Sequence, residues 1–248
     1  VLLHVFKDLR AGHAVGVRRL EGVGFYRIDD LDGAGQRDEG DFGIAVLGRL
    51  QDHPAVPKLG PVPAPVPPLD DGDLIELAGG MRNGNKLKAV IPGGSSMPVL
   101  PAETMMGLTM DYDAIQKAGS GLGSGAVIVM DETACMVRAC QRIARFYFKE
   151  SCGQCTPCRE GTGWMYRMLT RIVEKQATMD DLHMLKAAAG QIEGHTICAF
   201  GEAAAWPVQG FLRHFWREFE YAIVNRRFLV DDQRAGTVVE QATAEMVT

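Results

Sequence analysis

Three cysteines close together in the chain have the types and spacing of metal ligands. Cys152, Cys155 and Cys158 follow the pattern C-x2-C-x2-C, and Gly153 between them permits the unusual dihedral angles of a tightly curled loop. A [4Fe–4S] cluster commonly takes three cysteines from such a tight motif and a fourth from elsewhere. Cys198 is the candidate for the fourth ligand. The set predicts a [4Fe–4S] site and therefore electron transfer.

Other chemistry remains open for these residues. Zinc also binds four cysteines, although its usual pattern is two separated C-x2-C pairs, so a zinc-stabilised interaction module is the alternative. A disulfide is less expected in a reducing compartment. Cys135 and Cys140 fall on a helical pattern, where small core residues are expected rather than ligands. His195 lies near Cys198 and is expected to support the site or to pack, not to bind metal.

Helices are expected to position the four cysteines. After Asp131, apolar residues recur at helical spacing in four stretches: 136–147, 164–173, 182–192 and 208–219. The second helix is expected to start near Arg159, directly after the cysteine motif, so that its positive end faces the sulfurs. Thr178 and Asp181 predict a capping box at the start of the third helix. Four helices with short connections predict a small helical bundle.

A short sheet is expected before these helices. Apolar, β-branched-rich runs at 86–91 and 126–130 predict two strands, with a helical segment near 111–117 between them. The glycine-rich stretch 119–125 resembles a nucleotide-binding loop, but it precedes a strand, whereas a dinucleotide fingerprint follows one. A flexible turn is therefore the better interpretation. The aromatic side chains of Phe211, Phe215 and Trp216 are expected in the core or at a subunit interface.

Composition excludes several classes of protein. The chain has 248 residues and a formal net charge of −5, which gives no electrostatic reason to expect a nucleic-acid partner. No apolar run reaches the roughly 18 residues that a membrane-spanning helix needs. Val1–Phe6 is a short apolar run followed by charged residues, so no secretory signal is expected. A cytosolic protein is predicted, in which clustered cysteines favour metal binding over disulfides.

The first 73 residues differ in character from the rest. Seven of the 12 prolines lie within 54–68, which predicts an extended linker. All six cysteines and all 12 methionines come later. Residues 1–9 could form a strand or a short helix, and 29–41 is rich in Gly and Asp and predicts a loop. No cofactor fingerprint occurs in 1–73, which stays unassigned.

Four segments of the body resemble one family. Glu150–Gly161 is similar to the cysteine signature of the NADH-binding flavoprotein subunit of complex I, which is the F subunit of NADH-quinone oxidoreductase. His195–Cys198, followed by Gly201–Gly210, resembles the second signature of this family. Ala89–Ser96 and Gly121–Asp131 match its middle region. The resemblance runs from about residue 74 to about residue 219. Diaphorase subunits of hydrogenases and formate dehydrogenases share the cluster motif and are a second alternative.

The resemblance implies an α+β fold in two parts. A partial ubiquitin-like β-grasp domain of the SLBB type would occupy 74–133. A four-helix bundle carrying a [4Fe–4S] cluster would occupy 134–248. The ligands carried over from the family are Cys152, Cys155, Cys158 and Cys198.

The resemblance also implies a place in electron transfer. In the family, NADH reduces FMN, and single electrons then pass through this cluster toward quinone. The implied partners are the other subunits of the peripheral arm of complex I. The implied location is cytoplasmic, on the inner face of the cell membrane.

One part of the family pattern is missing. The glycine-rich loop that binds FMN in the family has no counterpart in the chain. A partial chain is therefore expected, with a front piece that is foreign or read in another frame. It would keep the electron relay, and the isolated chain is predicted not to oxidise NADH.

Overall fold

The computed structural model describes residue 72, residues 75–76, 80–81 and 84–236, together with the backbone of three earlier strands. These strands are β1 (Arg19–Leu20), β2 (Val23–Arg27) and β3 (Phe42–Val46). The expectations for 1–9 and 29–41, and the proline-rich linker at 54–68, lie outside the described residues. Within the described part, no helix is long and apolar enough to cross a membrane.

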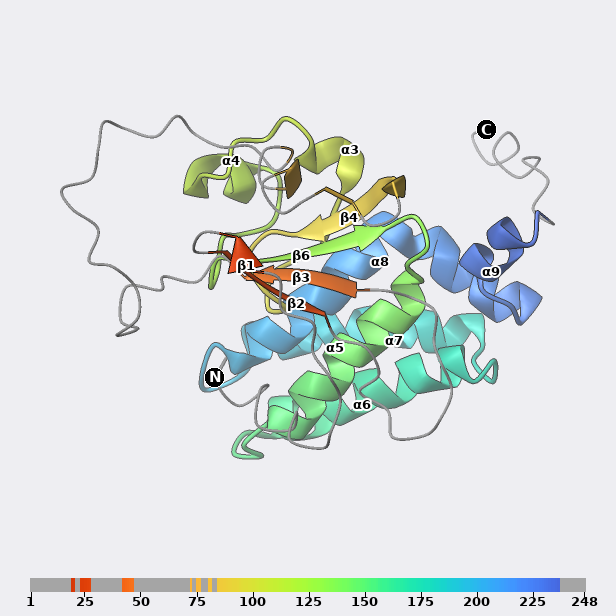
Figure 1. Ribbon diagram of the computed structural model, residues 1–248. Helices are drawn as coiled ribbons and strands as arrows, with labels where there is room; N and C mark the ends of the chain where they lie inside the picture. Colours follow the sequence, from red (N-terminus) through yellow and green to blue (C-terminus); the bar gives the residue numbers. More distant parts are fainter. Residues whose placement is uncertain are drawn as a thin grey trace.

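Six strands form one antiparallel sheet (Figure 1). The later strands are β4 (Leu87–Ile91), β5 (Leu100–Pro101) and β6 (Ala126–Asp131). The order is β1-β2-β3-β6-β4-β5. The strands expected at 86–91 and 126–130 are thereby confirmed. The sequence patterns predicted no strand at the positions of β1, β2 and β3, but β3 pairs with β6, so strands of this front piece belong to the same sheet.

Side chains alternate between the two faces of a strand. In β4 and β6 residues on both faces are buried, each face against a different core. Ala89 and Ile91 pack into the core shared with the long helices, whereas Val90 faces the opposite side. There it meets two short helices, α3 (Ala102–Met105) and α4 (Tyr112–Lys117), through Met105 and Ile115. Figure 1 shows α3 and α4 on one side of the sheet and α5 and α8 on the other.

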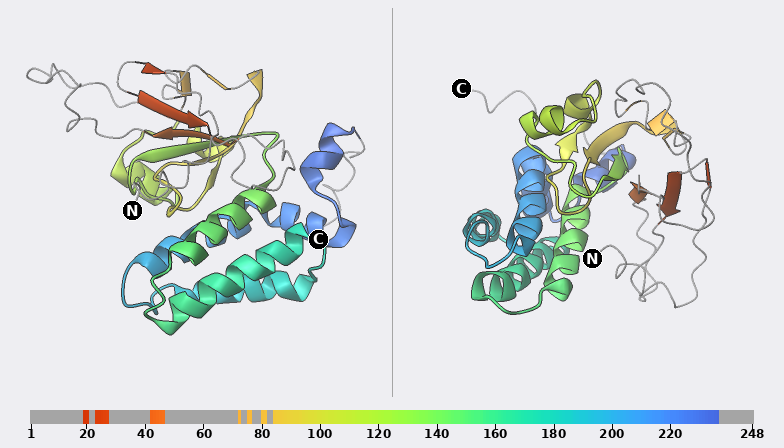
Figure 2. Two further views of the ribbon diagram at one scale, coloured as in Figure 1. Left: turned by 60° about the horizontal axis from the view of Figure 1, so that its bottom comes forward. Right: turned by 90° about the vertical axis from the view of Figure 1, so that its left-hand side faces the viewer.

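Long helices follow the sheet along the chain. They are α5 (Met136–Glu150), α6 (Thr156–Val173), α7 (Met179–Ile192) and α8 (Phe200–Asn225), and the short α9 (Leu229–Arg234) comes last. α5 packs on α6, α6 on α7 and α7 on α8, and α8 returns to α5. Figure 2 shows these four helices lying side by side below the sheet. The expected mixture of helices and strands is confirmed, as are the four expected helices.

Two local expectations are also confirmed. Thr178 and Asp181 form the capping box of α7, with each side chain bonded to the backbone of the other residue. The glycine-rich stretch 119–125 is a turn that leads into β6. Phe211 is fully buried, and Phe215 and Trp216 pack against the same core. These contacts hold α8 against its neighbours.

A buried ion pair joins the sheet to the long helices. The β4–β6 register shifts between Leu87 and Ala89, as at a β-bulge, and Lys88 lies at this shift. Its Nζ lies 2.7 Å from Glu218 Oε1 and donates to the Ala134 carbonyl at 2.9 Å. Glu218 Oε2 also accepts a bond from the Met136 N–H. This carboxylate therefore satisfies a free N–H group at the start of α5.

Candidate iron–sulfur site

The cysteine motif forms the connection between α5 and α6. α5 ends at Glu150, and α6 begins at Thr156 with Cys155 as its N-cap residue. The expected helix start near Arg159 is therefore too late by about one turn. Proline is accepted in the first turn because its missing N–H has no helical partner there, so Pro157 does not delay the helix. Cys158 consequently lies inside the first turn of α6.

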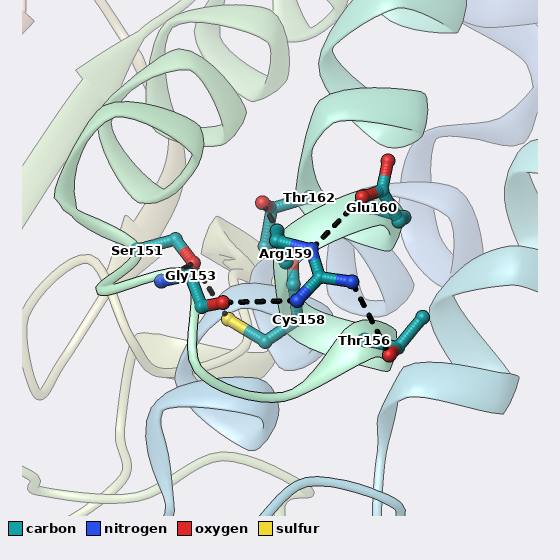
Figure 3. A network of polar contacts seen from close by, with 7 residues as sticks. All are labelled: Ser151, Gly153, Thr156, Cys158, Arg159, Glu160 and Thr162. Atoms are coloured by element: carbon teal, nitrogen blue, oxygen red, sulfur yellow. Dashed lines mark hydrogen bonds and ion pairs between the residues drawn. The ribbon is translucent and has the colours of Figure 1, made fainter.

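The loop is shaped by Gly153 and held by Arg159 (Figure 3). Gly153 has φ of +74°, a left-handed conformation that side chains disfavour, as the sequence predicted. Arg159 Nη1 donates to the Gly153 carbonyl at 3.2 Å, and Nη2 contacts Thr156 Oγ1 at 3.4 Å. Arg159 also pairs with Glu160 at 3.0 Å. The guanidinium thus spans the loop.

Cys158 is the most enclosed of the motif cysteines, with 5% of its surface exposed. Its Sγ lies 3.1 Å from Ser151 Oγ, and its carbonyl accepts a 2.8 Å bond from Thr162 Oγ1. Ser151 Oγ also accepts a bond from the Gly153 N–H at 3.3 Å. Sequence reasoning did not single out Ser151 or Thr162, because cysteine spacing says nothing about neighbouring hydroxyl groups.

The loop that carries Cys198 is anchored to α8. Glu193 is the C-cap residue after α7, and its carboxylate accepts bonds from Trp206 Nε1 at 2.6 Å and Gln209 Nε2 at 2.8 Å. These bonds lower the pKa of the Glu193 carboxyl below its usual range. The Gly194 N–H donates to Glu202 Oε1 at 3.0 Å. Trp206, Gln209 and Glu202 all belong to α8, so the start of the loop is tied to the helix that follows it.

The end of this loop is folded tightly. Thr196 Oγ1 donates to the Cys198 carbonyl at 2.7 Å. A side chain at Gly201 would meet Thr196 Oγ1 at 2.2 Å, so only glycine fits at this position. His195 is exposed, and its Nδ1 lies 2.8 Å from the carbonyl oxygen of Glu193. Its observed contact is thus with its own loop, and the prediction that it is not a ligand stays a prediction.

The pKa of the Cys158 thiol is influenced by the other three candidate cysteines. Burial raises the pKa of the Cys158 thiol, the Ser151 hydrogen bond opposes this, and negative charge on Cys155, Cys152 and Cys198 raises it further. Cys152 and Cys198 are exposed and Cys155 is half-buried, so three of the sulfurs are accessible from solvent.

The described residues form no site for a single metal ion. Among the described residues, no three His, Cys, Asp or Glu side chains converge closely enough to hold one metal ion. Four thiolates around one zinc would lie about 3.8 Å apart, given the Zn–S bond length. A cubane relaxes this demand, because each cysteine binds a different iron atom. The donor set, three thiols at the curled loop and the thiol of Cys198 before α8, fits such a cluster.

The remaining cysteines are core residues, as predicted. Cys135 precedes α5 and is 6% exposed, and Cys140 lies within α5 and is fully buried. Both pack in the core shared by the sheet and the long helices. Burial raises the pKa of both thiols. They are therefore held as neutral thiols away from the candidate site.

Comparisons with known proteins agree on this region. Residues 138–222 match the family described as the NADH-ubiquinone oxidoreductase-F iron-sulfur binding region. This span contains all four candidate ligands. The F subunit of NADH-quinone oxidoreductase of Rickettsia rickettsii (strain Sheila Smith) is 53% identical over 153 residues, which are 61% of this chain and 36% of that protein. The C-terminal part of the chain is therefore similar to proteins named F subunits of NADH-quinone oxidoreductase, as the sequence resemblance predicted.

A second relative and two solved structures extend the comparison. The F subunit of Rickettsia typhi (strain ATCC VR-144 / Wilmington) is 52% identical over 155 residues, covering 62% of this chain and 37% of that protein. The chain thus spans little more than a third of the length of these curated relatives. The NAD+-reducing [NiFe]-hydrogenase in its H2-reduced state gives a TM-score of 0.56 at 26% identity, covering 69% of this chain and 30% of that chain. Its air-oxidised state gives 0.55 at 29% identity, covering 68% of this chain and 29% of that chain.

Proposed function

We propose that the chain carries electrons through a [4Fe–4S] cluster bound by Cys152, Cys155, Cys158 and Cys198. The observation that carries the proposal is the match of residues 138–222, which contain all four cysteines, to an iron–sulfur binding region. As part of the flavoprotein subunit of an NADH-quinone oxidoreductase, the chain would receive electrons from FMN reduced by NADH. It would pass them on toward quinone.

When bound, the cluster would accept and donate one electron at a time. The chain's own residues provide the surroundings that such a carrier needs. The first turn of α6 directs the positive end of the helix toward the sulfurs, since Cys155 and Cys158 straddle its start. Arg159 adds a positive charge and keeps the loop curled. The Glu193 contacts with α8 keep the Cys198 loop in place without a ligand.

The domain organisation follows the same proposal. The SLBB-type β-grasp domain would include β4–β6 within 74–133, and the four-helix bundle would comprise α5–α8 within 134–248. The closed set of contacts among these helices supports the bundle. The other subunits of complex I would be the partners, and the chain would lie on the cytoplasmic side of the membrane as a peripheral component. Chain 1–248 alone would not oxidise NADH.

The similarity to a NAD+-reducing hydrogenase supports a second candidate, a diaphorase subunit of such an enzyme. The identity of 26% with that structure is about half the 53% identity with the Rickettsia rickettsii protein. The flavoprotein subunit of complex I is therefore the better assignment.

Anaerobic reconstitution with iron and sulfide tests the proposal. Purified 1–248 should turn brown, bind about four iron atoms per chain and give a paramagnetic signal after reduction with dithionite. A colourless protein with one bound zinc and no reducible signal would contradict the proposal and favour a zinc-stabilised interaction module. Flavin-dependent reduction of ferricyanide by NADH would contradict the expected lack of NADH oxidation by the isolated chain.

A further inference from the structure

Among the four candidate ligands, Cys158 is the one at which water cannot easily replace a lost hydrogen bond to sulfur. Its sulfur is buried and lies against the hydroxyl group of Ser151, whereas Cys152 and Cys198 are exposed. At an exposed sulfur, a water molecule can take the place of a lost hydrogen bond. At the sulfur of Cys158, the Ser151 hydroxyl has no such substitute.

The direction of the Ser151–Cys158 bond follows from the neighbouring contacts. The Gly153 N–H donates to Ser151 Oγ, so the oxygen is already used as an acceptor and its own hydrogen is free to donate. A cysteine bound to iron is a thiolate, which has no hydrogen to give. The bond at 3.1 Å must then run from the Ser151 O–H to Cys158 Sγ.

Backbone contacts keep this geometry in place. Ser151 caps α5, where its N–H donates to the Tyr147 carbonyl at 3.1 Å. On the other side, Thr162 Oγ1 bonds to the carbonyl of Cys158 in the interior of α6. Ser151 thus follows the end of α5, and Cys158 lies in the first turn of α6 (Figure 3). These two helices pack on each other.

Resting on the proposed function, we propose that Ser151 tunes the reduction potential of the cluster by donating a hydrogen bond to Cys158. One-electron reduction increases the negative charge on the thiolate ligands. A hydrogen bond to sulfur becomes stronger as that charge grows, so it favours the reduced state and raises the potential. The proton stays on Ser151 throughout, and no bond is made or broken.

The test is a redox titration of reconstituted 1–248, followed by electron paramagnetic resonance, with dithionite as the reductant. Ser151→Ala should bind as much iron as the unchanged chain, but its midpoint potential should shift to a more negative value. Ser151→Gly, which also lacks the hydroxyl, should shift in the same direction. Ser151→Thr retains the hydroxyl and should keep the potential close to that of the unchanged chain.

A matched control separates this bond from general effects on the loop. Thr156 carries a hydroxyl in the same connection, but it contacts Arg159 and belongs to the exposed side. Thr156→Ala should leave the potential unchanged. An equal shift in Thr156→Ala would show that any lost hydroxyl has this effect, and it would overturn the proposal.

Two further outcomes would overturn the role of Ser151. The first is an unchanged potential in iron-loaded Ser151→Ala and Ser151→Gly. The second is loss of iron from both variants while Ser151→Thr loads normally, which would make the hydroxyl an assembly group. Both differ from failure of the proposed function, in which the unchanged chain itself would bind no cluster.

Discussion

The two ends of α5 place cysteines in opposite surroundings. At the first end, Cys135 and Cys140 are buried among apolar side chains, and burial raises the pKa of their thiols. At the other end, about 22 Å away along the 15-residue helix, Cys152 begins the exposed loop before α6. Residue type is the same at both ends, so the surroundings decide which thiols are available to a metal.

The polar groups differ in the same way. At the first end, Glu218 pairs with Lys88 and accepts a bond from the Met136 N–H, so the charges and the helix N–H are already matched. At the second end, the hydroxyl of Ser151 and the positive start of α6 point at sulfur. At the first end the polar groups are paired with one another. At the second end they are suited to a bound cluster of negative charge.

Exchange of single cysteines should give the largest contrast between the two ends. Cys155→Ala removes a proposed ligand and should lower bound iron from about four atoms per chain to nearly none, with a lower melting temperature. Cys140→Ala removes only a buried sulfur and should cost about 1 kcal/mol of stability while iron binding stays intact. Iron analysis and thermal unfolding of reconstituted protein measure both. If iron content and melting temperature were unchanged in Cys155→Ala, its assignment as a ligand would be wrong.

Alkylation of the iron-free chain should separate the two ends next. Iodoacetamide reacts with thiolates, so exposed cysteines should be modified first. Cys152 and Cys198 should react rapidly, and Cys135 and Cys140 should react only after denaturation, because burial raises their pKa and excludes the reagent. Peptide mass spectrometry identifies the modified residues. Reconstitution with iron should protect Cys152 and Cys198, and rapid labelling of Cys140 in the native chain would contradict the comparison.

Disruption of the ion pair at the first end should affect stability alone. Lys88→Met leaves Glu218 without its cation, although both side chains are largely buried, with 18% and 10% exposed. Loss of one partner of a buried pair is expected to cost about 3 kcal/mol, at the lower end of the usual range because Lys88 keeps some contact with water. Denaturant unfolding measures this cost. Adding Glu218→Gln should recover part of it, and iron binding should be unchanged in both variants.

The sequence was most informative where local rules decide the structure. Helical periodicity located α5–α8, and the capping box at Thr178 was read directly from two residues. The four cysteines could be proposed together because their spacing is typical of an iron–sulfur motif. The start of α6 was misplaced, because the pattern treated the motif as a loop, although proline is compatible with a first helical turn.

Contacts between distant segments were not predictable in this way. Pairing of β3 with β6 joins residues far apart in the chain, and no local pattern in the first segment indicates that partner. The contact between Ser151 and Cys158 depends on where α6 begins, and that between Glu193 and Trp206 depends on how α7 packs on α8. Such contacts follow from tertiary packing, which periodicity alone does not specify.

The smallest expected effect concerns the anchor of the Cys198 loop. Trp206→Phe keeps the ring but removes the N–H that donates to Glu193 at 2.6 Å, and it should lower stability by about 1 kcal/mol. The folded-state pKa of Glu193 is lowered, so its contribution is fully present above the usual carboxyl pKa of 4.5 and is lost as the pH falls through the lowered value. The difference between Trp206→Phe and the unchanged chain should therefore be largest near neutral pH and should shrink below pH 4.5.

Thermal unfolding of the iron-free chains over this pH range measures the effect. Trp164→Phe is the matched control, because Trp164 is 56% exposed on α6, and the same exchange there should change stability little at any pH. If the cost of Trp206→Phe did not depend on pH, packing of the indole ring would account for it and the charge on Glu193 would not. The Cys198 loop would then be held by packing of the Trp206 ring against its neighbours, as Cys140 is held in the core at the first end of α5.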